Sequence, residues 1–240
     1  YGTRLHPPKS DVKGRLKAFI EDIAGQHAKL IIPSFSVGRT QQIVYFLNEL
    51  HHEGRIPPVP VFVDSPLSTR ATRVYEKHRD CYDSDAFEYV VAGDAPFAFH
   101  GLTYVTETED SKALNTLDGP AVIISASGMC EGGRILHHLK NNIEDPRTIV
   151  LIVGYQAEHT LGRRIVERRK PIRIFGEEYE LNARVHTINA LSAHADRSEL
   201  LAYFTEMGPR VARAFMVHGE EPACEALGQA LARLGAGEVV

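Results

Sequence analysis

The stretch Lys29-Leu-Ile-Ile-Pro-Ser-Phe-Ser-Val-Gly-Arg-Thr-Gln41 decides the fold class. It begins with a short apolar run, 29–33, continues with a loop of mostly small residues, 34–39, and leads into a segment with helical apolar spacing, 40–53. A short, continuous apolar run is typical of a strand that is buried on both faces of a parallel sheet. The stretch therefore predicts a strand–loop–helix unit of an α/β protein.

The same alternation continues over roughly the first 170 residues. Further short strands are predicted at 57–63, 102–105, 121–125 and 148–154, and helices at 16–27, 68–78, 133–141 and 162–169. Strands that alternate with helices form mostly parallel sheets with helices on both faces. Ligands of such sheets bind beyond the carboxyl ends of the strands, so the loops at 34–39, 64–69, 125–133 and 154–160 are expected at the functional edge.

The alternation ends near Pro171. Short strands are then predicted at 172–175, 179–181, 184–191 and 213–217, with helices at 197–207 and 221–234. This change of pattern predicts a domain boundary near residue 172. The first residue is Tyr1 rather than a methionine, and the last residues, 238–240, have the composition of a strand, so we expect a fragment of a longer protein.

Composition excludes several classes of protein. The 240 residues contain 27 Lys and Arg against 31 Asp and Glu, a formal net charge of −4, and 43% of them are hydrophobic. These values exclude a disordered chain, a collagen-like repeat and a disulfide miniprotein. The acidic balance disfavours non-specific coating of nucleic acid, although it permits a local basic groove. Three scattered cysteines favour a reducing cytoplasm, and the apolar runs are too short to span a bilayer.

Two of the twelve histidines stand where α/β proteins place functional groups. His194 lies at a predicted strand-to-helix junction and His218 lies at a predicted strand end. Their positions leave catalysis, metal binding and a hydrogen-bonded loop role open. Surface or packing roles are predicted for the adjacent pairs His51-His52 and His137-His138, because neighbouring residues do not share a helix face. A zinc site needs at least three protein ligands, so further ligands would have to lie outside the chain.

The segment Ser125-Ala-Ser-Gly-Met-Cys-Glu-Gly-Gly-Arg134 joins a predicted strand to a helix. Small residues let backbone N–H groups approach an anion, and a helix N-terminus favours negative charge. The alternative is a glycine-rich turn needed only for packing, and the segment is neither a Walker loop nor a dinucleotide fingerprint. Arginines flank these loops and would suit a polyanion, although arginines on helix surfaces are mostly solvated. The candidate phosphate ligands are Ser125, Ser127, Gly128, Arg134 and Arg39.

Nine motifs run in order through nearly the whole chain: Tyr1-Gly-Thr-Arg-Leu-His6, Ile32-Pro-Ser-Phe-Ser-Val-Gly-Arg-Thr-Gln41, Val63-Asp-Ser-Pro-Leu67, Ser125-Ala-Ser-Gly-Met129, Gly154-Tyr-Gln-Ala-Glu158, Thr160-Leu-Gly-Arg163, Ile174-Phe-Gly-Glu177, Ser192-Ala-His-Ala-Asp196 and Val217-His-Gly-Glu220. Together they resemble the β-CASP metallo-β-lactamase ribonucleases. The chain is most similar to the bacterial and archaeal relatives of the cleavage and polyadenylation specificity factor nuclease.

The resemblance implies an α/β fold in which a Rossmann-like, parallel-sheet β-CASP domain, 11–172, is inserted in an αββα metallo-β-lactamase domain. Residues 1–10 would end the first lactamase segment, and 173–240 would be its returning, incomplete part. The implied activity is zinc-dependent hydrolysis of single-stranded RNA in RNA processing or decay. The complete enzyme would hold two zinc ions, which this chain alone would not fully bind. The implied partner is the missing N-terminal half with its H-x-H-x-D-H ligands. A homodimer is left open, and no membrane partner is expected.

Residue roles follow from the same resemblance. His218 is expected to be a zinc ligand, His194 to assist catalysis near the scissile phosphate, and Ser192 to lie close to that phosphate. Asp196 belongs to the same motif and is expected to orient His194. His159 departs from the family pattern, because a small residue, often Gly, is expected at that position.

There are two alternatives to the nuclease from other classes of function. A non-catalytic RNA-binding or scaffold member of the family would have no chemical need for His194 and His218. A free nucleotide-binding α/β domain would need a phosphate loop that the sequence does not show. The sequence therefore favours a ribonuclease.

Overall fold

The structure, a computed structural model, describes residues 2–7, 11–91, 93–192, 194–208 and 211–240. It divides into two compact units. The larger, Lys9–Leu191, is named the sheet unit. The smaller, formed by Tyr1–Pro8 and Ser192–Val240, is named the small unit.

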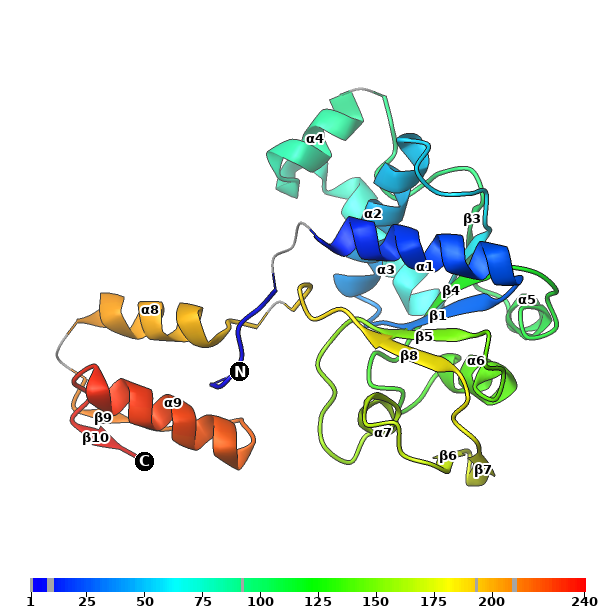
Figure 1. Cartoon of the computed structure of the whole chain (residues 1–240). Helices are drawn as coiled ribbons and strands as arrows, with labels where there is room; N and C mark the ends of the chain where they lie inside the picture. Colours follow the sequence, from blue (N-terminus) through cyan, green and yellow to red (C-terminus); the bar gives the residue numbers. More distant parts are fainter. Residues whose placement is uncertain (1, 8–10, 92, 193, 209–210) are drawn as a thin grey trace. The chain divides into compact units, whose positions relative to one another are not determined.

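A six-stranded parallel sheet forms the centre of the sheet unit, with the strand order β3-β2-β4-β1-β5-β8 (Figure 1). Its strands are β1 (Lys29–Pro33), β2 (Val61–Asp64), β3 (Leu102–Val105), β4 (Ala121–Ser125), β5 (Ile149–Ile152) and β8 (Arg184–Thr187). The predicted α/β class with a mostly parallel sheet is confirmed. Three of the strands, β1, β3 and β4, have the bounds that their apolar runs predict.

Helices cover both faces of this sheet (Figure 1). On one face lie α1 (Val12–Gln26), α2 (Arg39–His52) and α3 (Pro66–Lys77), and on the other lie α6 (Ile135–Asn142) and α7 (Leu161–Val166). The middle of β1 shows why the strand is apolar throughout. Leu30 and Ile32 pack in the core that includes α1 and α2, and Ile31, which points the other way, packs with α6 and α7.

The remaining elements of the sheet unit lie outside these layers. They are α4 (Ser84–Val91), α5 (Thr108–Ala113), the short 3-10 helix η2 (Arg79–Cys81), and the antiparallel pair β6 (Ile172–Ile174) and β7 (Glu177–Tyr179). After this pair the chain returns to the main sheet, where β8 lies beside β5. The compact unit thus extends to Leu191, past residue 172, and the division into family segments at residues 10 and 172 stays a prediction.

The small unit consists of α8 (Arg197–Met207), α9 (Glu221–Arg233) and the parallel pair β9 (Arg213–Ala214) and β10 (Glu238–Val239). Phe204, Leu231 and Ala236 form its buried core. The N-terminal segment packs tightly on α9, since a Cβ at Gly2 would come within 2.1 Å of the Ala223 carbonyl oxygen. Among the helices that the structure describes, none is both long and apolar enough to cross a membrane.

Candidate functional site

The carboxyl-terminal edge of the sheet brings several predicted loops together. The register places Ser125, the last residue of β4, opposite both Pro33 of β1 and Asp64 of β2. The Ser34 N–H donates to the Ser125 carbonyl oxygen at 2.9 Å, and the Ser125 hydroxyl donates to the Asp64 carbonyl oxygen at 2.9 Å. The loops after β1, β2 and β4 therefore start from one hydrogen-bonded edge, where ligands of parallel sheets bind.

The turn after β4 is closed by its own hydrogen bonds. The Ser127 N–H donates to the Gly132 carbonyl oxygen at 3.2 Å, and the Glu131 N–H donates to the Ser127 hydroxyl at 3.0 Å. Gly133 has a φ of +79°, and a Cβ there would lie 2.5 Å from the Ala126 carbonyl oxygen. Only glycine fits that position, so the shape of the turn requires this one of its small residues.

The loop after β5 locks this turn from the other side. Gln156 is buried, and its Nε2 donates to the Gly128 carbonyl oxygen at 2.9 Å. A Cβ at Gly162 would collide with the Gln156 side chain, at 1.7 Å from its Oε1. The Glu131 carboxylate accepts the N–H of Leu161, the first residue of α7, at 2.6 Å. The two loops therefore hold each other in one conformation.

This rigid turn contains hydrogen-bond donors suited to an anion. Among the described residues, no acceptor is bonded to the N–H groups of Gly128, which is buried, and of Met129, which is partly exposed. The predicted ligand Ser127 lies in the same turn and is partly exposed, whereas the predicted ligand Ser125 is buried and its hydroxyl is bonded to the Asp64 carbonyl. The Met129 N–H and the Ser127 hydroxyl are therefore the groups that an anion would meet first.

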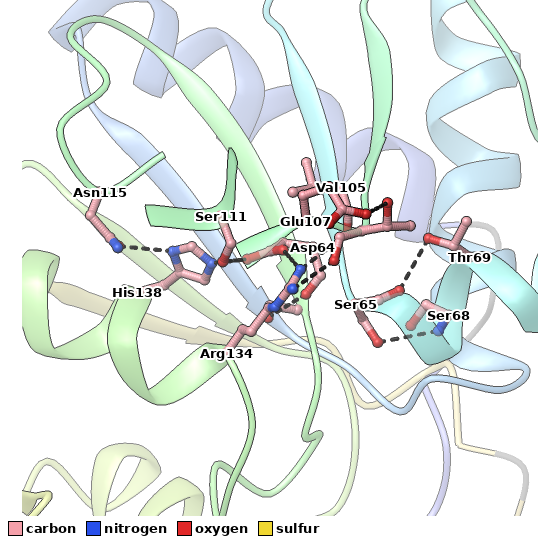
Figure 2. A network of polar contacts seen from close by, with 12 residues as sticks. Asp64, Ser65, Ser68, Thr69, Val105, Glu107, Ser111, Asn115, Arg134 and His138 are labelled. Carbon is pink, nitrogen blue, oxygen red and sulfur yellow. Dashed lines mark hydrogen bonds and ion pairs between the residues drawn. The ribbon is translucent and has the colours of Figure 1, made fainter. Parts of the chain in front are cut away.

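Asp64 is the centre of a buried polar cluster behind the turn (Figure 2). Its Oδ1 accepts a hydrogen bond from Arg134 Nη1 at 2.7 Å, and its Oδ2 accepts from Ser111 Oγ and His138 Nε2, both at 2.6 Å. The Asp64 and His138 side chains have no exposed surface. Burial alone would raise the pKa of Asp64, but the hydrogen bonds from His138, Ser111 and Arg134 outweigh it and hold that pKa below its usual value.

The contacts of Arg134 are all with the protein itself. Besides its ion pair with Asp64, its Nη1 donates to the Val105 carbonyl oxygen at 3.2 Å and its Nη2 to that of Thr106 at 2.7 Å (Figure 2). The side chain is 20% exposed. These contacts join the ends of β2 and β3 to the start of α6, which is an anchoring role, and phosphate binding by Arg134 stays a prediction.

The sequence assigned no role to Asp64 or Ser111, and it predicted only a surface or packing role for His138. His138 is fully buried in the cluster, while its neighbour His137 is exposed and packs on the Phe175 ring at 4.7 Å between centroids. Two signals were present in the sequence. Asp64 ends an apolar strand, and Arg134 and His138 are four residues apart, the spacing of side chains on one helix face.

The predicted basic rim is only partly available to a polyanion. Arg39, the first residue of α2, is partly exposed, and its Nη1 donates to the Gln42 side chain. Arg163 and Arg169 both pair with Glu167 at 2.6 Å. Arg39 therefore stays a predicted phosphate ligand, whereas Glu167 neutralises part of the charge near α7.

The small unit carries the predicted catalytic histidine. His194 is exposed, and its N–H donates to the Ser192 hydroxyl at 3.2 Å. Its carbonyl oxygen accepts from Nε2 of His6 at 2.7 Å. His218, the predicted zinc ligand, is also exposed and has a φ of +64°. Ser192 and His194 are thus in direct contact, and their roles near the scissile phosphate stay predictions.

Asp196 begins α8 as its N-cap. Its Oδ1 accepts from the Ser198 hydroxyl at 2.6 Å and from the Glu199 N–H at 3.0 Å, and its Oδ2 accepts from the His6 N–H at 2.9 Å. The Glu199 carboxylate in turn accepts the Asp196 N–H, which completes a capping box. The hydrogen bonds from Ser198, His6 and Glu199 hold the pKa of Asp196 well below its usual value. Asp196 therefore anchors both α8 and the segment that contacts His194.

The described residues offer too few ligands for a complete metal site. In the part of the chain that the structure describes, no group of three or more His, Cys, Asp or Glu residues could hold a metal ion. A zinc site needs at least three protein ligands, so His218 alone does not make one. The described residues therefore do not fit a complete zinc site, and no catalytic step through a metal follows from them.

Comparisons with known proteins match both parts of the chain. Residues 40–165 match the model of the Beta-Casp domain, and residues 178–240 match that of the Zn-dependent metallo-hydrolase RNA specificity domain. The chain is 40% identical over 235 residues to Ribonuclease TTHA0252 of Thermus thermophilus. It is 32% identical over 226 residues to Transcription termination factor FttA of Methanosarcina mazei and 30% identical over 224 residues to that of Methanocaldococcus jannaschii.

These relatives are longer than the chain. The match to the Thermus protein covers 98% of this chain and 53% of the relative. The matches to the two archaeal proteins cover 92% and 91% of this chain and 35% of each relative. The chain thus spans between a third and about half of the length of these curated relatives.

Proposed function

Because this chain belongs to the Beta-Casp family, we propose that it forms part of a zinc-dependent ribonuclease that hydrolyses single-stranded RNA in RNA processing or decay. The family assignment agrees with the resemblance predicted from the ordered motifs. The observation that carries the proposal is the position of His194 and His218, which are both exposed within the matched RNA specificity domain. Exposed imidazoles are suited to proton transfer and to metal binding.

His194 is proposed as the general acid that protonates the leaving 3′-oxygen of the RNA. Ser192, whose hydroxyl accepts the His194 N–H, is proposed to lie beside the same phosphate. Asp196 fixes the His6 segment that donates to the His194 carbonyl, so it is proposed to position His194 indirectly. General acids of this kind contribute roughly 10²- to 10⁴-fold to the rate.

A second phosphate of the RNA is proposed to bind at the turn after β4. Its ligands would be the N–H groups of Gly128 and Met129 and the hydroxyl of Ser127, with Arg39 adding positive charge. Ser125 would support this site through its bond to the Asp64 carbonyl rather than by touching the phosphate. Such a site binds the RNA backbone and carries no sequence information.

His218 is proposed as one zinc ligand of a site with two ions. Because the described residues do not complete that site, the other ligands are proposed to come from an N-terminal lactamase segment outside this chain. The protein is proposed to act in the cytoplasm.

The test compares the 240-residue chain with the longer protein that carries the upstream segment. Metal analysis and cleavage of a labelled single-stranded RNA are measured for both. We expect the 240-residue chain to bind less than one zinc ion tightly and to leave the RNA intact, and the longer protein to bind zinc and cut the RNA. Zinc-loaded longer protein that binds RNA without cutting it would support the scaffold alternative instead.

A second candidate function comes from the names of the archaeal relatives. They are transcription termination factors, at 30–32% identity to this chain over 224–226 residues. The same cleavage chemistry acting on a nascent transcript would serve such a role. A transcription assay with a stalled RNA polymerase distinguishes the two, because only a termination factor would release the polymerase from its template.

A further inference from the structure

Phe35 is a large apolar side chain placed at the functional edge of the sheet unit. It lies in the loop that follows β1 and is 48% exposed. Most large apolar side chains of the central strands are buried, because an exposed one forgoes the free energy of burial. No described aromatic ring packs against it. The exposure of Phe35 at this edge therefore calls for a ligand-binding explanation.

Its position is fixed by the surrounding loops. The Phe35 carbonyl oxygen accepts from the Thr40 hydroxyl at 2.8 Å and from the Thr40 N–H at 3.3 Å, and Thr40 is buried at the start of α2. The ring rests on Gly128, since a Cβ at Gly128 would lie 2.9 Å from Cδ2 and 3.0 Å from Cε2 of Phe35. One part of the ring is thus held by the turn after β4 while much of the residue stays exposed.

The groups around the ring are donors suited to phosphate. Gly128, on which the ring rests, is buried, and the next residue, Met129, is partly exposed and has an N–H with no acceptor among the described residues. The hydroxyls of Ser36 and Ser65 lie 3.4 Å apart in the neighbouring loops. An aromatic ring beside backbone donors matches the chemistry of a single-stranded nucleotide, which offers a π-face and a phosphate.

We propose that Phe35 is a stacking platform for one base of the RNA, and that the turn after β4 binds a phosphate of the same strand. The inference rests on the proposed function for its substrate class. It adds a residue that binds the base and takes no part in bond cleavage. Because every base has a π-face, such a platform would hold RNA with little sequence preference.

The rival explanation for an exposed phenylalanine is contact with a protein. Val37, in the same loop as Phe35, and Leu67, in the first turn of α3, are also exposed, at 59% and 52%. The unbonded and partly exposed N–H of Met129, next in sequence to the glycine that the ring contacts, favours the nucleotide, because an apolar protein surface over this patch would leave that N–H without an acceptor. The two explanations predict different effects of aromatic and aliphatic replacements.

The experiment measures RNA affinity for the full-length protein kept metal-free with a chelator, so that the RNA is not cut. The variants are Phe35→Leu, which keeps apolar bulk, Phe35→Trp, which keeps a stacking face, and Val37→Ser as the control for the apolar neighbours. A single abasic ribose is moved along the RNA oligonucleotide. Urea unfolding of each variant checks that the fold is intact.

We expect Phe35→Leu to weaken RNA binding roughly 5- to 150-fold, the range for loss of one base–aromatic stack, and Phe35→Trp to bind as the wild type does. An abasic ribose at one position should weaken wild-type binding by a similar factor and leave Phe35→Leu unaffected. Equal loss for Phe35→Trp and Phe35→Leu, or abasic effects that are the same in both proteins, would overturn the inference and leave the proposed function standing. A wild-type protein that binds no RNA would overturn both.

Discussion

Asp64 and His138, 74 residues apart in the sequence, are joined by a hydrogen bond of 2.6 Å between His138 Nε2 and Asp64 Oδ2, with both side chains fully buried. The other ring nitrogen of His138 lies 3.1 Å from Asn115 Oδ1. Ser111 of α5 and Arg134 also donate to the Asp64 carboxylate. Arg134 donates in addition to the carbonyl oxygen of Val105, the last residue of β3. One buried charge thus ties together the elements that frame the turn after β4.

Asp64→Asn should strongly destabilise the sheet unit. The substitution removes the negative charge that faces Arg134 and His138, and breaking a buried pair costs about 3–5 kcal/mol. The matched control is Glu109→Gln, the same chemical change in an ion pair with Lys112 whose side chains are 82% and 66% exposed. That change should cost less than about 1 kcal/mol. Free energies of unfolding from urea titrations check both, and equal effects would show that the cluster adds no stability.

The pH dependence of stability should follow the same carboxylate. The pKa of Asp64 is lower in the folded protein than its usual value, so its contribution is fully present above the unfolded pKa, near 4, and is lost as the pH falls through the folded pKa. The free energy of unfolding should therefore fall from pH 5 to pH 3 in the wild type. Asp64→Asn should show a smaller fall over this interval. A steeper fall in the variant than in the wild type would show that the ionised Asp64 carboxylate does not stabilise the folded protein.

Arg134→Ala tests whether this arginine anchors the fold or binds RNA. Its loss leaves Asp64 without its cation, so we expect the free energy of unfolding to drop by about 1.5–3 kcal/mol. If Arg134 also binds a phosphate, as predicted from the sequence, the slope of log RNA affinity against log salt should flatten by about 0.7 in the metal-free protein. An unchanged slope would leave Arg134 with the anchoring role alone. Arg39→Ala, at a predicted phosphate ligand, is the comparison in which that flattening is expected.

The sequence predicted the sheet well because its central strands are buried on both faces. The strands predicted at 29–33 and 121–125 match β1 and β4, which are buried along their whole length, residue for residue. The strand predicted at 102–105 also matches β3, which lies at the edge of the sheet and is only partly buried. The helix α4 (Ser84–Val91) was missed because it contains Phe87, Tyr89, Val90 and Val91, which have low helix propensity. The helix α5 was missed because its six residues are too few for a periodic pattern.

The loops of the site were predicted, but their partners were not. Strand ends and small residues placed the turn after β4 at the functional edge without knowledge of the fold. The bond between His138 and Asp64, and that between Arg134 and the same carboxylate, depend on which strands are neighbours, and local sequence does not encode that order. For the same reason β8 was not recognised as a neighbour of β5.

The two histidines of the small unit should give different phenotypes in the full-length protein. His218→Ala should lower zinc content and activity together, because a ligand is lost. His194→Ala should keep the zinc and lower the turnover number roughly 10²- to 10⁴-fold, as for loss of a general acid. Metal analysis and cleavage rates on the same preparations separate the roles. Loss of zinc in His194→Ala would make His194 a ligand.

His159→Gly should stabilise the protein, although it removes a side chain. His159 has a φ of +68°, in the left-handed region that costs a residue with a Cβ about 1–2 kcal/mol. This conformation gives a physical reason for the glycine expected there from the family pattern. Glycine removes that strain but adds freedom to the unfolded chain worth about 0.5–1 kcal/mol, so the net gain should be about 0.5–1 kcal/mol.

The matched control for His159→Gly is His159→Ala, which also removes the imidazole but keeps a Cβ and therefore keeps the strain. Because the His159 side chain is exposed, its loss should by itself cost little, and His159→Ala should gain nothing. Urea unfolding of the wild type and both variants, at a pH where histidine is neutral, measures the difference. Equal stability of the Gly and Ala variants would show that the backbone at this position is not strained. A loss in both would show instead that the imidazole stabilises the loop.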